Sequence, residues 1–194
     1  MPGFQIHIAI GKRYIDKHNE IQNVEEFLDG VIAPDFVEDK SKSHYTVKTP
    51  KENLKRYLAS KVNLEAFLQE NKVESDYEKG VFLHLLTDKL FFTEFFPDEY
   101  IKNVDYSTFC KDLYTSYDET NHYLEEKYNI QFNNTMQKKI QKNIQDSKRD
   151  KEMDEERGNN ILPIGELDKF IEYVSNIDLC TYTKSCLLYT SPSP

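Results

Sequence analysis

The stretch from Ser75 to Phe92 constrains the fold most, because it predicts a helix with no face left for solvent. Ser75 and Glu78 form the S-x-x-E pattern of an N-terminal capping box. The apolar residues behind it cover every side of a helical wheel: Val81, Phe82, Leu83, Leu85, Leu86, Leu90, Phe91 and Phe92. A helix that is apolar all round is buried on all sides, so the rest of the chain must surround it. We therefore predict an all-α, single-domain helical bundle with a buried central helix at about residues 76–95.

The remaining chain has the spacing of helices that bury one side. Glycine and proline are scarce, at 6 and 7 of 194 residues, and apolar residues recur three and four positions apart. We expect a helix that starts at Asn23 and is ended by Gly30 and Pro34, a polar loop over 35–48, and a helix opened by Thr49. Further helices are expected as follows: a short one from Asn63, one over 106–128, a highly charged one over 133–157, and an amphipathic one with Leu167, Phe170, Ile171 and Val174.

The two ends of the chain are less regular. Phe4, Ile6, Ile8 and Ile10 alternate as in a strand, but no partner strand is visible downstream, so we predict a helix. The last ten residues, 185–194, have neither helical nor strand spacing. They resemble translated adaptor read-through at the ends of some metagenomic gene fragments. We therefore assign the domain to residues 1–184, and 185–194 to a non-native tail.

Composition limits the classes of partner. The chain has 25 Lys and Arg against 34 Asp and Glu, a net charge of −9, and so lacks the basic surface that a long nucleic acid needs. No apolar run approaches the roughly 18 residues that span a bilayer. The three cysteines, Cys110, Cys180 and Cys186, include no C-x-x-C pair, so we expect neither a disulfide framework nor a thiolate metal site. These features predict a soluble cytoplasmic protein, in which any metal is held by nitrogen and oxygen.

The clearest chemical signal is a histidine and an aspartate on the apolar helix. His84 and Asp88 are four residues apart and therefore point together from one helix face. An unpaired polar group costs about 2–7 kcal/mol when buried, and a charge costs more. A divalent cation would compensate both groups at once. A simple hydrogen-bonded His–Asp pair is the alternative.

Three other positions carry suitable side chains. Asp35 follows Pro34 at a helix end, His44 lies nine residues later in the expected loop, and His7 lies in the apolar N-terminal segment. Each alone is more typical of a turn, a solvated loop residue or a core histidine than of a functional site.

Taken together, the order His7, Pro34-Asp35, Ser43-His44-Tyr45 and His84-Leu-Leu-Thr-Asp88 resembles the zinc-dependent phospholipase C family, whose all-helical fold is shared with single-strand nucleases. The resemblance covers roughly residues 3–130. It implies a cluster of two or more zinc ions, and a phosphodiester hydrolase acting on a small phosphorylated molecule or a phospholipid head group. The metal ligands that it implies are His7, Asp35, His44, His84 and Asp88. For Asp35 it also implies a catalytic role, either in bridging the ions or in orienting or deprotonating the attacking water.

The sequence also departs from the family. Its secreted phospholipases use the amino group of an N-terminal Trp as a ligand, and this chain has no Trp. The family's later His-x-x-x-Glu pair is replaced by Asp118-Glu-Thr-Asn-His122, in which the residue types are reversed. We include Asp118 as a sixth candidate ligand, because it lies near the apolar stripe of its helix.

A phosphohydrolase of the HD superfamily is a less favoured hypothesis, because that family requires a contiguous His-Asp pair, which does not occur here. A non-catalytic, metal-binding helical protein of the same fold is the main alternative, since the missing ligands could mark lost activity. The sequence leaves the substrate, the number of ions and the oligomeric state open.

Overall fold

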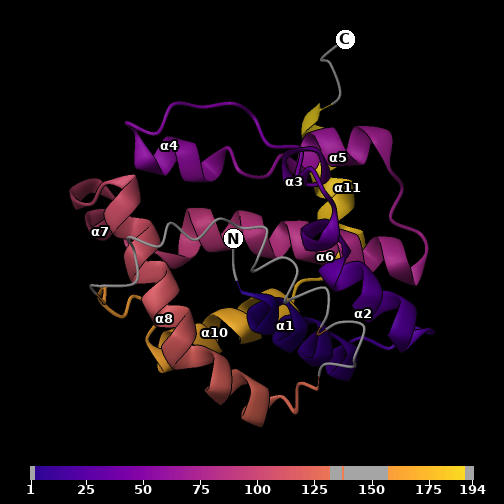
Figure 1. Cartoon of the computed structure of the whole chain (residues 1–194). Helices are drawn as coiled ribbons and strands as arrows, with labels where there is room; N and C mark the ends of the chain where they lie inside the picture. The colour runs from indigo at the N-terminus through magenta and orange to yellow at the C-terminus, as the bar shows by residue number, and fades with distance from the viewer. Residues whose placement is uncertain (1–2, 132–136, 138–156, 191–194) are drawn as a thin grey trace.

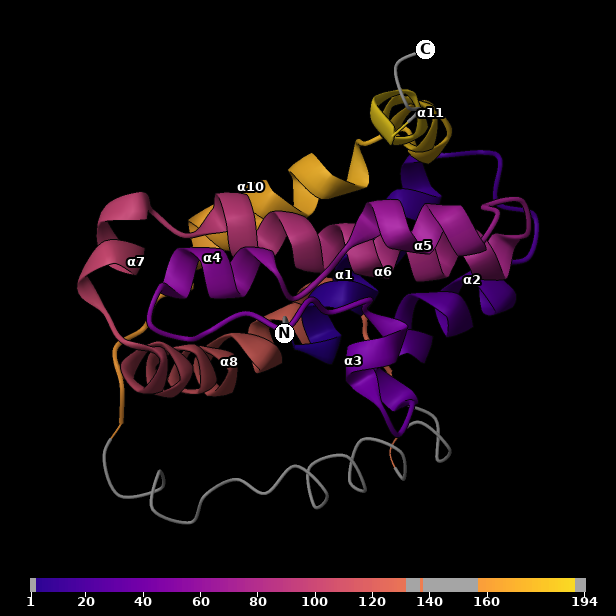
Figure 2. The ribbon, with the colours of Figure 1, turned by 90° about the horizontal axis from the view of Figure 1, so that it is seen from above.

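Helix α6 (Asp76–Leu90) runs through the middle of the molecule in both ribbon views (Figure 1 and Figure 2). Its N-terminus is the predicted capping box: the Ser75 side chain accepts a hydrogen bond from the Glu78 amide, and the Glu78 side chain accepts one from the Ser75 amide. Phe82, Leu83, Leu85 and Leu86 are each 0% exposed although they lie on different sides of the helix. The prediction of a buried central helix is confirmed.

The structure is a computed structural model that describes residues 3–131, 137 and 157–190, with the backbone alone for 187–190. Within these ranges it is helical and contains no strand, so the all-α prediction is confirmed. The other helices are α1 (Phe4–Lys17), α2 (Val24–Ile32), α3 (Lys40–Ser43), α4 (Leu54–Ala59), α5 (Leu64–Glu70), α7 (Asp98–Asn103), α8 (Tyr106–Lys127), α10 (Ile164–Ser175) and α11 (Leu179–Thr190). A 3₁₀ turn, η1 (Ala33–Phe36), follows α2, and a π-helical turn, η2 (Phe91–Phe95), continues α6.

The ambiguous N-terminal segment forms helix α1, as predicted. Ile6, Ala9, Ile10 and Tyr14 are all 0% exposed, which is the three-and-four spacing of a helix face in a core. Of the residues that had suggested a strand, Ile6, Ile8 and Ile10 are therefore buried by helical packing, and Phe4 is partly buried. α1 contacts α2, α6, α8 and α10, and this position brings its residues beside the central helix.

Asparagine side chains begin three of the helices. Asn23 and Asn63 accept hydrogen bonds from the third helical amide of α2 and α5, at the predicted starts. α4 begins later than predicted, because Asn53 rather than Thr49 caps it. The segment 35–48 is not wholly a loop: it contains the second half of η1 and the short helix α3, which Asp39 caps.

The crossing of α2 and α6 depends on two glycines. These two helices form the most extensive contact between elements of the described chain. A Cβ atom on Gly30 would lie 2.2 Å from the Tyr77 carbonyl oxygen, and one on Gly80 would lie 2.1 Å from the Phe27 carbonyl oxygen. The prediction that Gly30 helps to end α2 is therefore wrong: Gly30 lies within the helix, where the missing side chain lets two backbones touch.

The C-terminal region is partly as expected. In α10, Leu167, Phe170, Ile171 and Val174 are buried, as their spacing predicted. α11 extends to Thr190, so the expectation that residues from 185 onward lack helical structure is wrong for 185–190. The charged helix expected at 133–157 lies outside the described residues, apart from Gln137 and Arg157.

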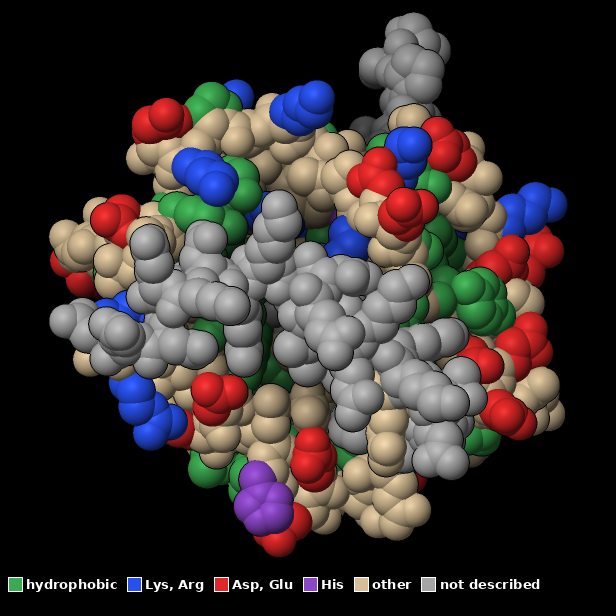
Figure 3. Space-filling view, in the orientation of Figure 1, with side chains coloured by type: hydrophobic (Ala, Val, Ile, Leu, Met, Phe, Trp, Pro, Cys, Tyr) green, Lys and Arg blue, Asp and Glu red, His purple; other side chains and the backbone are tan. Residues whose placement is uncertain are grey.

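Charge is distributed unevenly on the surface. On the face in Figure 3, acidic side chains stand along the edge where α2 lies in Figure 1, whereas basic side chains are scattered. Within the described residues, no helix combines the length and hydropathy that crossing a bilayer requires.

The helix crossing provides a stability test. Gly80→Ala should lower the free energy of unfolding by about 2 kcal/mol or more, because the new methyl group can fit only if two backbones separate. Urea unfolding followed by circular dichroism measures the change. Gly165→Ala is the matched control, since a Cβ there has no neighbour within 4 Å, and it should raise stability by up to about 1 kcal/mol. Equal stability of Gly80→Ala and wild type would contradict the proposed backbone contact.

Candidate metal centre

The predicted pair on the central helix faces the interior. His84 and Asp88 are both 0% exposed, and the His84 Nε2 atom lies 3.7 Å from Asp88 Oδ2. The capping box and the apolar residues around them place this part of α6 in the middle of the core. A carboxylate at this depth requires compensating charge or hydrogen bonds.

Helix α1 contributes His7. Its side chain is 1% exposed, and its Nε2 atom lies 3.3 Å from Asp88 Oδ1. The His7 and His84 rings are stacked, with centroids 3.9 Å apart and planes 9° from parallel. Two imidazoles from distant parts of the sequence therefore adjoin the same carboxylate.

The segment after α2 contributes the other two candidates. Asp35 lies in η1 just after Pro34, and His44 is the residue that ends α3. His44 Nε2 lies 3.1 Å from Asp88 Oδ2, 3.1 Å from His84 Nε2 and 3.9 Å from Asp35 Oδ1. The structure thus brings five of the six predicted residues together, all at most 3% exposed: His7, Asp35, His44, His84 and Asp88.

Backbone carbonyls determine how two of the histidines are oriented. His84 Nδ1 lies 2.7 Å from the Val31 carbonyl oxygen, and His44 Nδ1 lies 2.8 Å from that of Lys40. Because a carbonyl only accepts, each Nδ1 carries the proton and donates it. Each neutral ring therefore turns an Nε2 lone pair inward. Metal-ligating histidines commonly have this arrangement, in which the second ring nitrogen donates to a carbonyl.

The inward-facing atoms form a group of acceptors without enough donors. His44 Nε2 and His84 Nε2 face each other, and two neutral acceptors cannot form a hydrogen bond. Both ring nitrogens of His7 and both oxygens of Asp88 are buried without a hydrogen-bond partner of good geometry in the described structure. Leaving such groups unsatisfied costs about 1–3 kcal/mol each. A cation among them would satisfy several at once.

Two overlapping groups of three residues could each hold an ion, and both include His84, whose single inward-facing Nε2 atom can bind only one of them. Ligand atoms lie within 4.8 Å of one another in His7, Asp35 and His84, and also in His44, His84 and Asp88. The two oxygens of Asp88 point to different histidines, Oδ1 to His7 and Oδ2 to His44, so this carboxylate could bridge two ions. Imidazole nitrogen and carboxylate oxygen are typical zinc ligands.

The electrostatic environment favours the ligand forms of two of these groups. Burial, together with the nearby His7, lowers the pKa of His84 to about 3, so its ring is neutral near pH 7. Burial acts to raise the pKa of Asp88, yet the surrounding histidines hold it well below its ordinary value. Burial acts to lower the pKa of His44, but the adjacent Asp88 carboxylate, 3.1 Å away, raises it overall. A metal would therefore compete with a proton chiefly at His44.

The sixth candidate does not join the cluster. Asp118 is exposed on α8, and its neighbour Tyr117 is buried. Adjacent helical residues differ by about 100° in direction, so burial of Tyr117 turns Asp118 outward. His122 is also on the outer side, with a side chain 80% exposed and paired with Glu126 at 3.4 Å. The prediction that Asp118 completes the site is therefore wrong.

Sequence reasoning missed Lys40. Its Nζ atom lies 3.3 Å from Asp35 Oδ1, and its carbonyl accepts the hydrogen bond from His44. The signal was the four-residue spacing between Lys40 and His44, which is meaningful only if that segment is helical. Tyr45, the next residue, has a left-handed backbone (φ 54°) that closes the turn.

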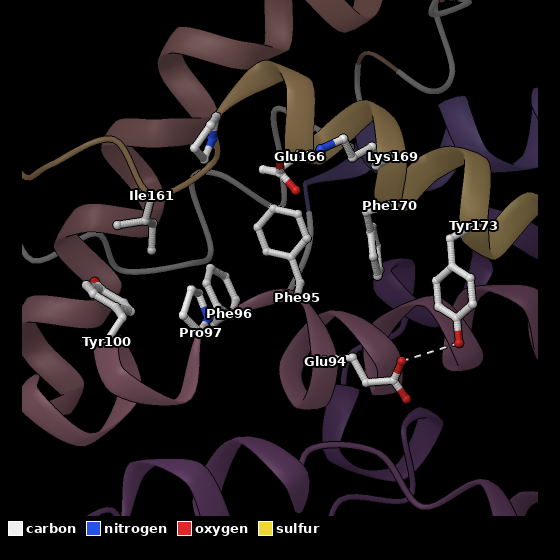
Figure 4. Close-up of a pocket in the computed structure, with 11 residues that line it drawn as sticks. Glu94, Phe95, Phe96, Pro97, Tyr100, Ile161, Glu166, Lys169, Phe170 and Tyr173 are labelled. Atoms are coloured by element: carbon white, nitrogen blue, oxygen red, sulfur yellow. Dashed lines mark hydrogen bonds and ion pairs between the residues drawn. The ribbon is translucent and has the colours of Figure 1, made fainter.

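A separate hollow lies away from the cluster. It has a volume of about 600 Å³ and lies between η2, α7 and α10 (Figure 4). Aromatic rings line much of it, and the Tyr173 hydroxyl donates a hydrogen bond to Glu94 across one side. It contains none of the five clustered residues, so it does not extend the candidate metal centre.

Comparison with known proteins does not identify the chain. No protein-family model matches it, and no curated protein or solved structure gives a significant match.

The cluster predicts a link between metal and stability. Zinc should raise the melting temperature of the chelator-treated wild type by about 4 °C or more, because an ion that binds only the folded state stabilises it by mass action. Asp88→Asn should lose at least half of that rise, since one shared carboxylate is neutralised. Differential scanning calorimetry with and without zinc measures both.

Asp118→Asn is the matched control for the calorimetry. It removes an equivalent charge from an exposed position and should respond to zinc as the wild type does. An identical zinc response in Asp88→Asn and wild type would exclude Asp88 as a ligand.

Proposed function

We propose that the protein is a metal-dependent hydrolase of phosphate esters, first of all phosphodiesters, with zinc bound at the cluster. The observation that carries the proposal is the convergence of three imidazoles and two carboxylates from four separate elements, which form two overlapping groups of three with ligand atoms within 4.8 Å of one another. This set agrees with the ligands implied by the resemblance to zinc-dependent phospholipases C. When bound, zinc ions would supply Lewis acidity and an activated water for attack at phosphorus.

The residues of the chain have distinct proposed roles. Asp88 directs its two oxygens toward separate histidines, which suits the bridging position. Asp35 belongs to one ligand group and also contacts Lys40 on the less buried side of the cluster. We therefore assign Asp35 to orienting the attacking water and accepting its proton.

The charge of the protein favours a small substrate. With a net charge of −9, the chain repels long polyanions, whereas a single phosphodiester needs only local positive charge. A phospholipid head group or another small phosphorylated molecule is the proposed substrate. A cytoplasmic location is also proposed, because the three cysteines are free thiols.

A non-catalytic metal-binding protein is the second candidate. It is favoured by the depth of the cluster, since His84 and Asp88 are 0% exposed and His7 is 1% exposed. A structural ion would use such a closed site, while an enzyme must keep a position open for water and substrate. The exposure of Asp118 and His122 also leaves the cluster without the additional ligands considered from sequence.

Metal content and turnover together test the proposal. Purified without chelator, the wild type should contain about two zinc ions per chain by elemental analysis and should hydrolyse bis(p-nitrophenyl) phosphate. Asp35→Asn should reduce kcat/KM by about 100-fold or more while keeping at least one ion, because a proton acceptor is lost and most ligands remain.

The control variant in this assay is Asp118→Asn, which should retain wild-type metal content and activity. Zinc without turnover in the wild type would favour the non-catalytic candidate. A metal-free, fully folded wild type that gains no ion on zinc addition would exclude both candidates.

A further inference from the structure

Lys40 is attached to the cluster in two ways. Its carbonyl oxygen accepts the proton of His44 Nδ1, which orients one predicted ligand. Its ammonium group lies 3.3 Å from Asp35 Oδ1, and so contacts a second. The Lys40 side chain is 36% exposed, whereas that of Asp35 is 4% exposed. Lys40 therefore extends from the buried cluster toward the surface, the direction from which a soluble ligand arrives.

The formal charge of the site reverses when cations bind. Asp35 and Asp88 contribute −2 and Lys40 contributes +1, which gives −1 with neutral histidines. This ion-free site repels an anion. Each divalent ion adds +2, so the loaded site is positive and attracts one.

A cation bound to Asp35 would weaken the contact between Lys40 and Asp35. A cation that takes an oxygen of Asp35 competes with the ammonium for the same lone pairs and repels it electrostatically. The lysine side chain is a flexible stem that ends in three donors, so it can turn to a nearby partner without backbone movement. The anionic oxygen of a phosphoryl group at the cluster is a suitable new partner.

We propose that Lys40 is the anion-binding residue of this site: it neutralises Asp35 in the ion-free protein and contacts a phosphoryl oxygen of the ligand once cations occupy the cluster. This inference rests on the proposed function, because it requires both the cations and a phosphorylated ligand. It assigns the Lys40 side chain to substrate binding in addition to the orienting contact of its backbone.

We expect Lys40→Gln to raise the affinity for zinc and to lower the affinity for phosphate. Lys40→Gln removes a cation that competes for Asp35, so zinc should bind about 3–10-fold more tightly. The same change removes a phosphate donor, so the zinc-loaded variant should bind inorganic phosphate about 5–10-fold more weakly. Lys40→Arg keeps the charge and should retain phosphate binding. A purely structural ion pair would instead weaken zinc and phosphate binding together.

Zinc affinity is measured by titration against a chromogenic chelator. Phosphate affinity is measured by equilibrium dialysis of radiolabelled inorganic phosphate against protein freed of excess zinc. Lys42→Gln is the matched control: it lies in the same short helix, but its side chain is 86% exposed and pairs with Asp39. It should leave both affinities unchanged.

The outcomes separate the two proposals. If the wild type binds zinc and Lys40→Gln binds phosphate as tightly as the wild type, the role of Lys40 is overturned and the hydrolase proposal stands. Zinc-loaded wild type that binds no phosphate also overturns the role of Lys40. A wild type that binds no zinc overturns both. Weakening of both affinities in Lys40→Gln assigns the lysine to structure alone.

Discussion

The structure is organised around a single carboxylate, Asp88, that is fully buried among imidazole rings. Both of its oxygens lie close to histidine nitrogens, at 3.3 Å from His7 and 3.1 Å from His44. An ionised group in a protein core is costly unless charge or hydrogen bonds compensate it. The surrounding elements therefore have two tasks: they exclude water with apolar side chains, and they bring compensating groups to this one point.

Helix packing achieves this convergence through close backbone contact. Gly30 and Gly80 let α2 and α6 approach so closely that no side chain separates them. In the same crossing, the carbonyl of the next residue, Val31, reaches His84 Nδ1 at 2.7 Å. The glycines therefore affect the candidate metal centre as well as packing. The hydrogen bond to Val31 places the His84 proton on Nδ1, so that the Nε2 lone pair faces the cluster. The α2–α6 crossing therefore contributes both to stability and to the orientation of His84.

The depth of the cluster and the position of Lys40 have opposite implications for function. Side chains that are 0–3% exposed suit an ion that holds helices together. The Asp35–Lys40 pair, however, connects this buried group to a partly exposed ammonium. On that side a phosphoryl group could be recognised without opening the core, and this asymmetry supports the proposal that the cluster binds a phosphorylated ligand.

The sequence alone predicted the central helix, most of the other helices and the His84–Asp88 pair. Apolar spacing and the Ser75–Glu78 capping box are local properties, and the four-residue spacing of His84 and Asp88 follows from helix geometry alone. Convergence of His7, Asp35 and His44 on that pair was anticipated only through a family resemblance, because residues tens of positions apart meet through tertiary packing.

Only the tertiary structure decided the remaining features. It turned Asp118 outward, because the other side of α8 is buried; it placed Gly30 within a helix crossing rather than at a helix end; and it revealed Lys40, whose segment had been read as a loop. Each of these depends on which neighbour covers a residue. Local sequence does not encode that information, because burial becomes favourable only when two surfaces from distant parts of the chain come into contact and exclude water.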